Sequence, residues 1–532
     1  MEELMYEYTN PVIPGFNPDP SICRAGDDFY LVTSSFEFFP GVPVYHSRNL
    51  VNWELIGYCL TRKEQLPLDD CQSSRGIYAP TIRYHDGIFY MTTTNTHLKA
   101  DGERYGNFIV HTKDIRGEWS APVWIDQKGI DPSLLFTDGK AYFCSNAGMK
   151  PDDEKGIYVC EINPLTGEKL TPSRFISRGC GGKCTEAPHI YHINEWYYLL
   201  LAEGGTGHGH TAVIQRSRDI YGPYESCPHN PILSNVKLHR YPVQAIGHAD
   251  IIEDGNGCWW AVCLGIRLLA TQLRHLIGRE TFLVPIRWEN GWPMGITDET
   301  VHPKMSGPLP DCPKTPCFDI TDNFSASFSE APGASFSEVP CAGKLSLNWN
   351  YIRNPDKSRY CIKDGCLNLY GTKETLSGKS PVFTGVRQQS FNIECTAKIN
   401  TDIKTGTRAG ITAFLNENYH YDLALDMRQD GLYIAVNRRV HDFEAFSFQE
   451  KLSASGEAEL RITADENYYY FSYRFCDSQL NTQWRMADKA MTAGLCAEGT
   501  FSGCFTGTYI GLFSSGGNAS FAGFSLKNLS EN

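Results

Sequence analysis

Hydrophobic and polar residues alternate along this chain in short runs, and no long stretch shows a convincing helical period of 3.6 residues. Five aromatic runs stand out in the first half. Each follows a turn that contains Gly, Asp or Asn, which is typical of β-hairpins because these residues tolerate positive φ. The predicted strands are Phe29–Val32, Ile88–Met91, Ala141–Phe143, Trp196–Leu199 and Trp259–Val262.

The five runs belong to a repeat, because one aromatic residue in each recurs after about 50 to 60 residues, a period typical of propellers and related arrays. A further pattern, Ser47–Trp53, is echoed by Thr112–Trp119 and Ser217–Tyr224, and predicts a turn that opens the outermost strand of a blade. Short strands closed around an axis predict a five-bladed β-propeller, and a sandwich or solenoid with a similar repeat is the alternative. The repeating aromatics are Tyr30, Tyr90, Tyr142, Tyr197 and Trp259.

Eleven positions before each of these aromatics lies the start of the predicted innermost strand. Innermost strands line the axis of a propeller, so their starts are expected to surround one mouth of the channel. A single Asp-Pro usually caps a turn, but matched repeat positions favour a shared site. The five starts are Asp19, Ala79, Asp131, Glu186 and His248, so three carboxylates and a histidine are predicted to converge.

The second half of the chain has a different pattern. The Pro-rich segment 302–322 predicts a linker or a stretch of chain that runs over the domain surface, and alternating strands follow from about Phe324. Such strands without helices predict a β-sandwich of the jelly-roll, concanavalin-like kind. The chain is therefore predicted to be all-β, with a propeller over 1–315 and a sandwich over 323–532. The strands expected in the sandwich are Leu345–Asn350, Phe391–Ile399, Ala409–Phe414, Tyr419–Met427, Gly431–Val436, Ala458–Ala464, Tyr468–Phe475 and Tyr509–Phe513.

Composition and charge disfavour several classes of partner for this chain. Its 532 residues carry a net charge of −13, so nucleic acid and anionic membranes are poor partners. The acidic start lacks the apolar core of a signal peptide, which predicts a cytoplasmic location. The 19 cysteines show no ligand-like spacing beyond a single pair, Cys180 and Cys184, and are expected to be reduced thiols rather than zinc ligands.

Three carboxyl groups around one axis suit the cleavage of a glycosidic bond. One must be protonated to donate to the leaving oxygen, and another must be ionised to activate water or attack the sugar. A neighbouring third carboxylate raises the pKa of the acid by repulsion. Arg279 is a candidate for sugar hydroxyls, with a surface ion pair as the alternative. Aromatic residues near the strand starts would either stack on a sugar ring or pack in the core: Phe36, Phe38, Phe39 and Tyr78.

Several motifs resemble glycoside hydrolase family 43, in its β-xylosidase and α-L-arabinofuranosidase branch with a C-terminal β-sandwich. The resemblance covers nearly the whole chain. Its motifs are Asn17-Pro18-Asp19-Pro20-Ser21, Ser34-Ser35-Phe36-Glu37, Pro40-Gly41-Val42-Pro43, Thr185-Glu186-Ala187-Pro188, Ala202-Glu203-Gly204-Gly205-Thr206-Gly207, Gly247-His248-Ala249-Asp250 and Gly278-Arg279-Glu280, with 347–355 and 383–389 in the second domain.

The resemblance implies a five-bladed propeller and inversion at the anomeric carbon. It implies Asp19 as general base, Glu186 as general acid, and Asp131 as the residue that modulates the pKa of the acid and orients it. It further implies an aromatic from the sandwich that walls the pocket, which favours trimming of chain ends. The expected substrate-binding residues are Phe36, Tyr78, Ala79, Thr206, His248, Arg279 and Phe505.

The chain departs from the resemblance at three aromatic or histidine positions. Tyr78 and Phe38 stand where relatives usually show Trp, and Tyr45 where they often show His. These changes alter the shape of the pocket and leave open the choice between xylose and arabinofuranose. The leading hypothesis is an inverting exo-acting enzyme that releases xylose from the non-reducing ends of β-1,4-xylo-oligosaccharides.

The alternatives are an α-L-arabinofuranosidase acting on arabinoxylan or arabinan fragments, an enzyme with both activities and, more remotely, a non-catalytic sugar-binding propeller. The only partner expected is a small oligosaccharide, and association with further copies of the chain is left open. No cofactor and no metal site are expected, with a divalent cation near His248 as the open alternative.

Overall fold

The computed structural model describes residues 5–147, 154–296, 298–315, 317–325, 343–453, 456–475, 483–501 and 503–529. Pro316, in the predicted linker, lies outside the described residues. The chain forms two compact units. The first contains residues 1–268 and 279–316, and the second contains 269–278 and 317–532.

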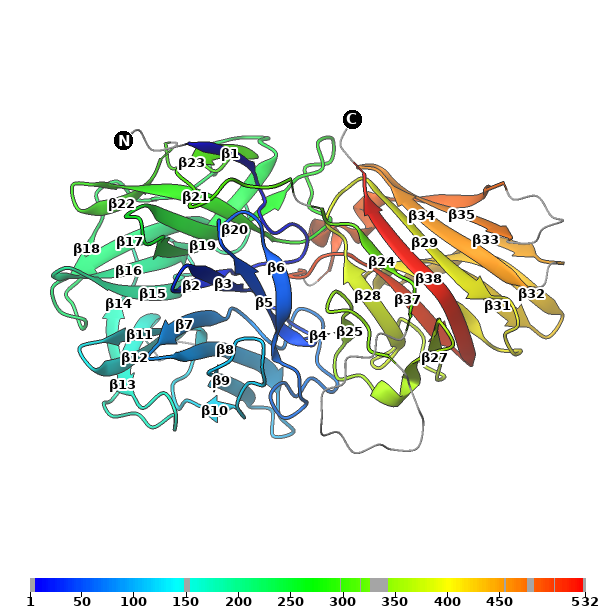
Figure 1. Cartoon of the computed structure of the whole chain (residues 1–532), viewed down its shortest axis with the longest axis horizontal. Helices are drawn as coiled ribbons and strands as arrows, with labels where there is room; N and C mark the ends of the chain where they lie inside the picture. The colour runs from blue at the N-terminus through cyan, green and yellow to red at the C-terminus, as the bar shows by residue number, and fades with distance from the viewer. Residues whose placement is uncertain are drawn as a thin grey trace. The chain divides into compact units, whose positions relative to one another are not determined.

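The first unit contains five four-stranded antiparallel sheets, each built from strands in chain order, with β4 left out of the first (Figure 1). In chain order the blades are β2 (Ser21–Ala25), β3 (Asp28–Val32), β5 (Gly41–Ser47) and β6 (Glu54–Leu60); β7 (Thr81–His85), β8 (Ile88–Leu98), β9 (Arg104–Thr112) and β10 (Val123–Trp124); β11 (Ile130–Thr137), β12 (Lys140–Ala147), β13 (Gly156–Ile162) and β14 (Arg174–Ser177); β15 (Glu186–Ile193), β16 (Trp196–Glu203), β17 (Thr211–Ser217) and β18 (Glu225–Ser226); and β19 (Val243–Glu253), β20 (Trp259–Arg267), β21 (Glu280–Glu289) and β22 (Trp292–Gly295).

The innermost strands close a ring, because β2 contacts β7, β7 contacts β11, β11 contacts β15, β15 contacts β19 and β19 returns to β2. The predicted five-bladed propeller is confirmed. The turns predicted after Ser47, Thr112 and Ser217 each precede an outermost strand, namely β6, β10 and β18. Outside the blades, β1 (Tyr6–Thr9) pairs with β23 (Lys304–Gly307), and β4 covers Phe38–Phe39.

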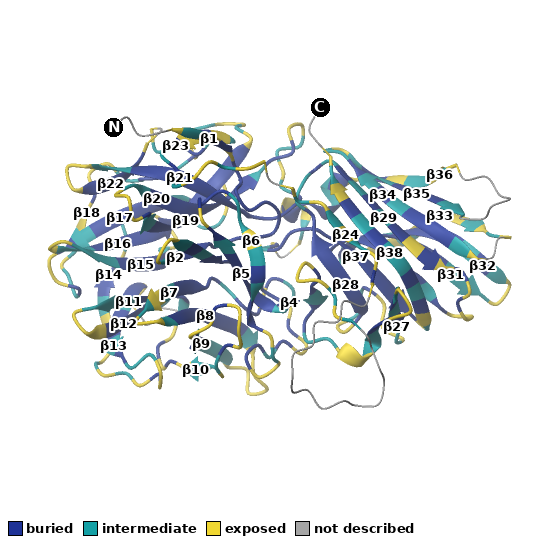
Figure 2. Cartoon of the chain, viewed as in Figure 1, coloured by how far each residue is buried: buried dark blue, intermediate teal, exposed yellow. Residues whose placement is uncertain are grey.

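Burial follows the strands and exposure follows the turns (Figure 2). The inner strand β2 is buried from its first residue and β11 and β15 from their second, and all three are more exposed toward their hairpins. Three of the first four hairpin turns contain an Asp or an Asn with positive φ, at Asp86, Asp138 and Asn194. The chemistry of these turns therefore sets the register of the blades.

The second unit is a sandwich of two antiparallel sheets. One is β24 (Ile320–Asp322), β26 (Tyr360–Lys363), β27 (Cys366–Tyr370), β38 (Asn518–Asn528), β29 (Ile393–Asn400), β34 (Glu457–Ala464), β35 (Tyr468–Phe475) and β36 (Arg485–Met491). The other is β28 (Val382–Arg387), β37 (Tyr509–Ser515), β30 (Arg408–Asn416), β31 (Tyr419–Arg428), β32 (Gly431–Val440) and β33 (Phe443–Lys451). Short elements are β25 (Tyr351–Ile352), η1 (Lys357–Arg359), η2 (Thr492–Leu495) and η3 (Ala497–Gly499).

One segment differs from the predicted division of the chain. Leu269–Gly278, between β20 and β21, falls in the second unit although the sequence predicted it within a domain covering 1–315. The reason is burial, because Leu269, Leu276 and Ile277 join the hydrophobic core of the sandwich. The hydroxyl of Thr508 also donates to the carbonyl of Leu276 over 2.9 Å.

The predicted strand Leu345–Asn350 was wrong. This stretch contains a turn, and the indole of Trp349 donates to a carboxylate oxygen of Asp322 over 3.0 Å. Seven strands of the two sheets were not predicted, namely β24, β26, β27, β28, β33, β36 and β38. In β33 none of the residues is buried, although three of the nine are Phe. The other predicted strands of the sandwich are present with ends shifted by at most a few residues.

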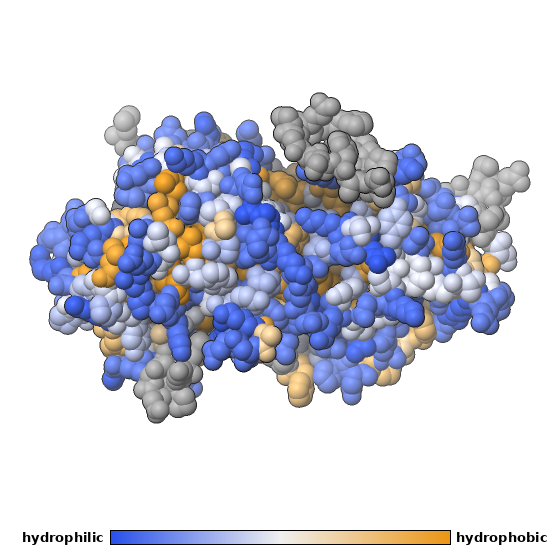
Figure 3. Space-filling view, turned by 90° about the horizontal axis from the view of Figure 1, so that it is seen from below, coloured by the Kyte–Doolittle hydropathy of each residue, from blue (hydrophilic) through white to orange (hydrophobic). Residues whose placement is uncertain are grey.

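Hydrophilic residues predominate on the face shown in Figure 3, and hydrophobic ones gather there only in small groups. Among the described residues, no helix has the length and apolarity that crossing a bilayer requires. Most cysteines of the described residues are free thiols, but Cys361 is disulfide-bonded, which departs from the expectation of reduced thiols throughout.

Candidate active site

The starts of the inner strands share an unusual backbone conformation. Asp19, Asp131 and His248 have φ values of 55°, 52° and 48°, in the left-handed region. Asp and His are enriched among the non-glycine residues that adopt this conformation, which costs about 1–3 kcal/mol and is concentrated at functional sites. Irregular pairing accompanies two of them, since the register shifts between Ile130 and Ser133 and between Gly247 and Asp250. The repeat therefore imposes a local geometry as well as a position.

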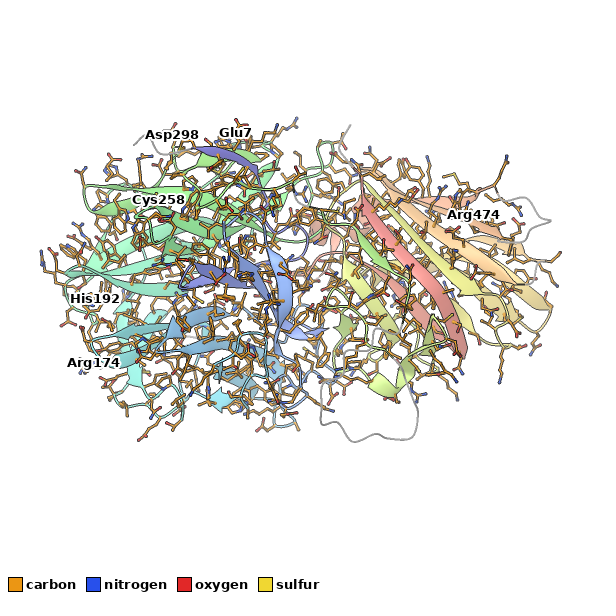
Figure 4. All side chains as sticks on the ribbon, in the orientation of Figure 1. Glu7, Arg174, His192, Cys258, Asp298 and Arg474 are labelled. Atoms are coloured by element: carbon orange, nitrogen blue, oxygen red, sulfur yellow. The ribbon has the colours of Figure 1, made fainter. Side chains whose placement is uncertain are left out.

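The fourth blade departs from the predicted register by one residue. The aromatic third residue of β16 is Tyr198, whereas the prediction counted from Tyr197, and both are aromatic. Counting eleven back from Tyr198 gives Ala187, which has the same left-handed φ, 53°. Glu186 thus lies one position before the residue equivalent to Asp19 and Asp131. His192, labelled in Figure 4, marks the far end of the same strand.

Asp19 is buried among groups that favour its charged form. Its Oδ1 accepts from Nη1 of Arg279 over 3.0 Å, and its Oδ2 accepts from the hydroxyl of Ser34 over 2.5 Å. Nδ1 of His248 lies 3.6 Å from Oδ1. Burial alone would raise the pKa of Asp19, but Arg279, His248 and Ser34 outweigh it and lower the pKa. Asp19 is therefore an ionised carboxylate at neutral pH.

Asp131 is buried beside the other two acids. Its Oδ2 accepts from the backbone amide of Ala187 over 3.2 Å, which ties the third blade to the residue after Glu186. Burial, followed by the negative charges of Glu186 and Asp19, raises the pKa of Asp131 well above its ordinary value. This repulsion requires that the carboxyl groups of Asp19, Asp131 and Glu186 lie close to one another, as the repeat predicted.

Glu186 is less completely buried than the other two acids. Burial, and then the charge of Asp19, raises its pKa to about 7, and Arg279 opposes the change. The sequence attributed this kind of shift to a third carboxylate. In the structure the charge of Asp19 also raises the pKa of Glu186, and Asp131 in addition holds the adjacent backbone.

Arg279 lies at the centre of the polar contacts. Its Nη1 donates to Thr206 over 2.9 Å as well as to Asp19, so it joins the loop between β16 and β17 of the fourth blade to the first blade. Its guanidinium carbon lies 5.5 Å from the ring centroid of Phe36. Arg279 is buried, which contradicts the alternative of a surface ion pair.

The predicted aromatic residues divide into two groups. Phe38 and Phe39 are buried in the core. The ring of Phe36 lies 5.1 Å from that of Tyr78, and Phe36 is bridged to Ile77 in the backbone, so Phe36 and Tyr78 lie side by side next to Arg279. Ala79, which follows Tyr78, is buried. It occupies in the second blade the repeat position that Asp19 and Asp131 occupy in the first and third.

Two buried histidines, His248 and His210, belong to the surroundings of Asp19. Burial lowers the pKa of His248, so it is mainly neutral at pH 7 despite the nearby carboxylate. The sequence did not single out His210, whose Nδ1 lies 3.2 Å from the carbonyl oxygen of Ala245 and whose pKa burial lowers to about 3. A side chain at Gly247 would meet the His210 ring at 2.5 Å. The sequence signal was the position of His210 shortly after Thr206.

A second buried network, which the sequence analysis missed, joins the inner strands. Asp250 accepts from Arg83 over 2.8 Å, from Ser21 over 2.7 Å and from Tyr191 over 2.5 Å. Arg83 also lies 2.9 Å from Nδ1 of His189. These residues come from four blades, so the network links the ring across its axis.

The residues described here include no cluster of three or more His, Cys, Asp or Glu side chains suited to a metal ion. A cavity of about 400 Å³ borders Glu186 within the first unit. Its lining includes Asn146, Arg178, Cys184 and Thr185. Phe505 belongs to the second unit, and its predicted role stays a prediction.

Comparison with known proteins identifies both parts of the chain. Residues 8–293 match Glycosyl hydrolases family 43, and residues 341–526 match the Beta xylosidase C-terminal Concanavalin A-like domain. A non-reducing end alpha-L-arabinofuranosidase of Bacteroides ovatus is 40% identical over 521 residues, which cover 96% of this chain and 91% of that protein. A xylosidase/arabinosidase of Butyrivibrio fibrisolvens is 38% identical over 446 residues, covering 80% and 81%.

A solved structure described as a family 43 protein of a Bacteroides ovatus xyloglucan PUL superposes with a TM-score of 0.88 at 39% identity. The similarity covers 98% of this chain and 100% of that one. The sequence comparisons and the structural superposition both cover the two parts of the chain. The chain belongs to glycosyl hydrolase family 43.

Proposed function

We propose that this protein is an inverting, exo-acting glycoside hydrolase that releases xylose from the non-reducing ends of β-1,4-xylo-oligosaccharides. The observation that carries the proposal is the opposite tuning of two neighbouring carboxyl groups. Arg279, His248 and Ser34 lower the pKa of Asp19, whereas burial and Asp19 raise the pKa of Glu186 to about 7. A base and an acid are thereby available together at neutral pH.

In this mechanism Glu186 protonates the glycosidic oxygen as the bond to the anomeric carbon breaks. Asp19 removes a proton from the water that attacks the opposite face of that carbon, so the configuration inverts. Asp131 holds the amide of Ala187 and thereby the backbone beside Glu186. Arg279 and Thr206 are placed to bind sugar hydroxyls, and Phe36 and Tyr78 to contact the ring.

The choice of sugar is tested by a panel of xylobiose, arabinan oligosaccharides, an aryl β-xyloside and an aryl α-L-arabinofuranoside. The proposal expects release of xylose from xylobiose, and proton NMR of the first product to show the inverted anomer. Retention of configuration contradicts the mechanism, and binding of sugars without turnover would favour a non-catalytic propeller.

The second candidate is an α-L-arabinofuranosidase, or an enzyme with both activities. It is favoured by the relative from Bacteroides ovatus, which bears that activity in its name and is 40% identical across nearly the whole chain. Tyr78, beside Phe36, is the residue at which the pocket would accommodate one pentose or the other. In the same panel, faster cleavage of the aryl arabinofuranoside than of the aryl xyloside would favour this candidate.

A cytoplasmic location is part of the proposal. The exposed free thiols of Cys184, Cys312 and Cys317 support it, because a reducing compartment preserves such groups, whereas the disulfide at Cys361 counts against it. Fractionation of the source cells followed by immunodetection tests it, and recovery outside the cytoplasm would contradict it.

A further inference from the structure

Glu203, the last residue of β16, is a buried carboxylate whose purpose the family comparison does not explain. It is only 4% exposed. Its oxygens accept from the backbone amide of Cys180 over 2.6 Å and from that of Gly182 over 3.0 Å, and one lies 3.3 Å from the hydroxyl of Thr185. These partners all belong to the segment 178–185, called here the acid-leading segment because Glu186 follows it.

The acid-leading segment is shaped to fit the carboxylate. Gly179 and Gly181 have positive φ, 86° and 102°. A side chain at Gly179 would meet Oε1 of Glu203 at 2.2 Å, and one at Gly182 would meet Oε2 at 2.5 Å. Glycine is therefore required at two positions for the amides to reach Glu203. A carboxylate is suited to this place, because its two oxygens accept from several amides at once.

The contacts continue from Glu203 to the residue next to Glu186. The hydroxyl of Thr185 is shared between Glu203 and the carbonyl of Arg178, 3.1 Å away. The carbonyl of Thr185 accepts from Asn146 over 2.6 Å. On the other side of Glu186, the amide of Ala187 donates to Asp131. The backbone of Glu186 is thus held on both sides, by Glu203 and Asn146 before it and by Asp131 after it.

The acid-leading segment also lines the cavity beside Glu186. Arg178, Gly182, Cys184 and Thr185 lie on that wall, whereas Glu203 does not. A leaving group that receives a proton from Glu186 must lie next to it, so one segment both carries the acid and borders the space beside it. Displacement of the segment would therefore affect protonation of the leaving group first.

We propose that Glu203 is a positioning residue, which aligns the general acid Glu186 with the leaving oxygen by holding the acid-leading segment in place. The proposal rests on the proposed function, because it requires Glu186 to donate a proton. It assigns no contact between Glu203 and substrate. It predicts that loss of Glu203 impairs the step that needs the acid more than the other steps.

The test compares Glu203→Gln with the wild type on substrates whose leaving groups differ in their need for protonation. Gln keeps the size of Glu but presents one amide donor toward backbone amides. We expect kcat on xylobiose to fall by about 10- to 100-fold, which is part of the roughly 100- to 10,000-fold that general acid catalysis contributes, and kcat on a dinitrophenyl β-xyloside to fall by less than about threefold. The alkaline limb of the pH profile on xylobiose should move as well.

Asp254→Asn is the matched control. Asp254 is also a buried carboxylate that accepts two backbone amides, those of Asn256 and Cys258, but it lies in the hairpin turn of the fifth blade (Cys258 is labelled in Figure 4). This variant should lower the melting temperature without changing the ratio of the two kcat values.

The outcomes separate the two proposals. If the wild type cleaves neither substrate, the proposed function fails. If the wild type and Glu186→Gln show the leaving-group effect but Glu203→Gln lowers both rates equally, as Asp254→Asn could, Glu203 has only a structural role and this inference is overturned. Should Glu203→Gln fail to fold, Glu203→Asp, which keeps the charge, should give the same selective loss on xylobiose to a smaller extent. An unchanged ratio for that variant also overturns the inference.

Discussion

Nη1 of Arg279 lies 3.0 Å from Oδ1 of Asp19, and both side chains are almost fully buried. A guanidinium so close to a carboxylate in a low-dielectric site favours the ionised form of the acid. The contact therefore sets the charge of the proposed base, in addition to any contact of Arg279 with the sugar.

Replacement of Arg279 by Met should lower kcat/KM by about 100-fold and raise the pKa of Asp19, because the largest opposing charge is lost while burial remains. The acid limb of the kcat/KM profile should then move to higher pH. The measurement is kcat/KM against pH on an aryl xyloside, with thermal unfolding to show that the variant is folded. A lower rate with an unmoved acid limb would mean that Arg279 serves only to bind substrate.

Ser34→Ala is predicted to shift the same limb by a smaller amount. The Ser34 hydroxyl donates to Oδ2 of Asp19 over 2.5 Å and favours the charged form through one hydrogen bond, without a full charge. Loss of a hydrogen bond to a charged group costs about 1.5 kcal/mol at the lower end of its usual range, so kcat/KM should fall by about 10-fold. The same pH titration measures both variants. A larger shift for Ser34→Ala than for Arg279→Met would contradict the conclusion that Arg279 lowers the pKa of Asp19 more than Ser34 does.

Glu186→Gln is predicted to remove the alkaline limb of the pH profile. The pKa of Glu186 is raised to about 7, so the acid loses its proton as pH rises through that value, and kcat/KM on xylobiose in the wild type should fall above about pH 7. The variant should lose about 100- to 10,000-fold on xylobiose and much less on an activated aryl xyloside. Equal losses on both substrates would count against Glu186 as the acid.

The repeat could be predicted from the sequence because an aromatic residue follows each inner hairpin turn, which has two residues in the first four blades and five in the fifth. The same counting failed by one residue in the fourth blade, where Tyr197 and Tyr198 are both aromatic. Left-handed backbone at Ala187 distinguishes the two registers, and it is visible only in three dimensions. The repeat therefore identified Asp19, Asp131 and Glu186 as candidate site residues, but it did not predict that Glu186 lies one position before the residue equivalent to the other two.

Residues whose partners are distant in sequence could not be found. Glu203 lies about 20 residues from the amides that it accepts, and Asp250 lies 167 residues from Arg83. Both lie in motifs that carry the family resemblance, but the motifs gave no role to either residue, since a buried carboxylate in a strand resembles any polar residue until its partners are known. The segment Leu269–Gly278 was assigned to the propeller for a similar reason, because its burial in the sandwich core depends on residues hundreds of positions away.

Asp250 has no exposed side-chain surface, and Arg83 is its main cationic partner. Arg83→Met would leave this carboxylate buried without its counter-charge, so the free energy of unfolding should fall by about 3–5 kcal/mol. Arg24→Met is the control, because Arg24 pairs with Glu253 at 3.9 Å on the partly exposed surface and should cost about 1 kcal/mol or less.

The pH dependence of the free energy of unfolding shows whether Arg83 stabilises the protein through its charge. Burial would raise the pKa of Asp250, but Arg83, His189 and Tyr191 lower it below the unfolded value of about 3.9. The wild type therefore holds the stability from this carboxylate above about pH 4 and loses it as pH falls toward the lower folded pKa. In Arg83→Met the folded pKa rises, so the difference in free energy of unfolding between the two proteins should shrink as pH falls from 7 to 4. Urea unfolding at both pH values measures this difference, and one that is constant with pH would show that Arg83 stabilises the ring by packing rather than by charge.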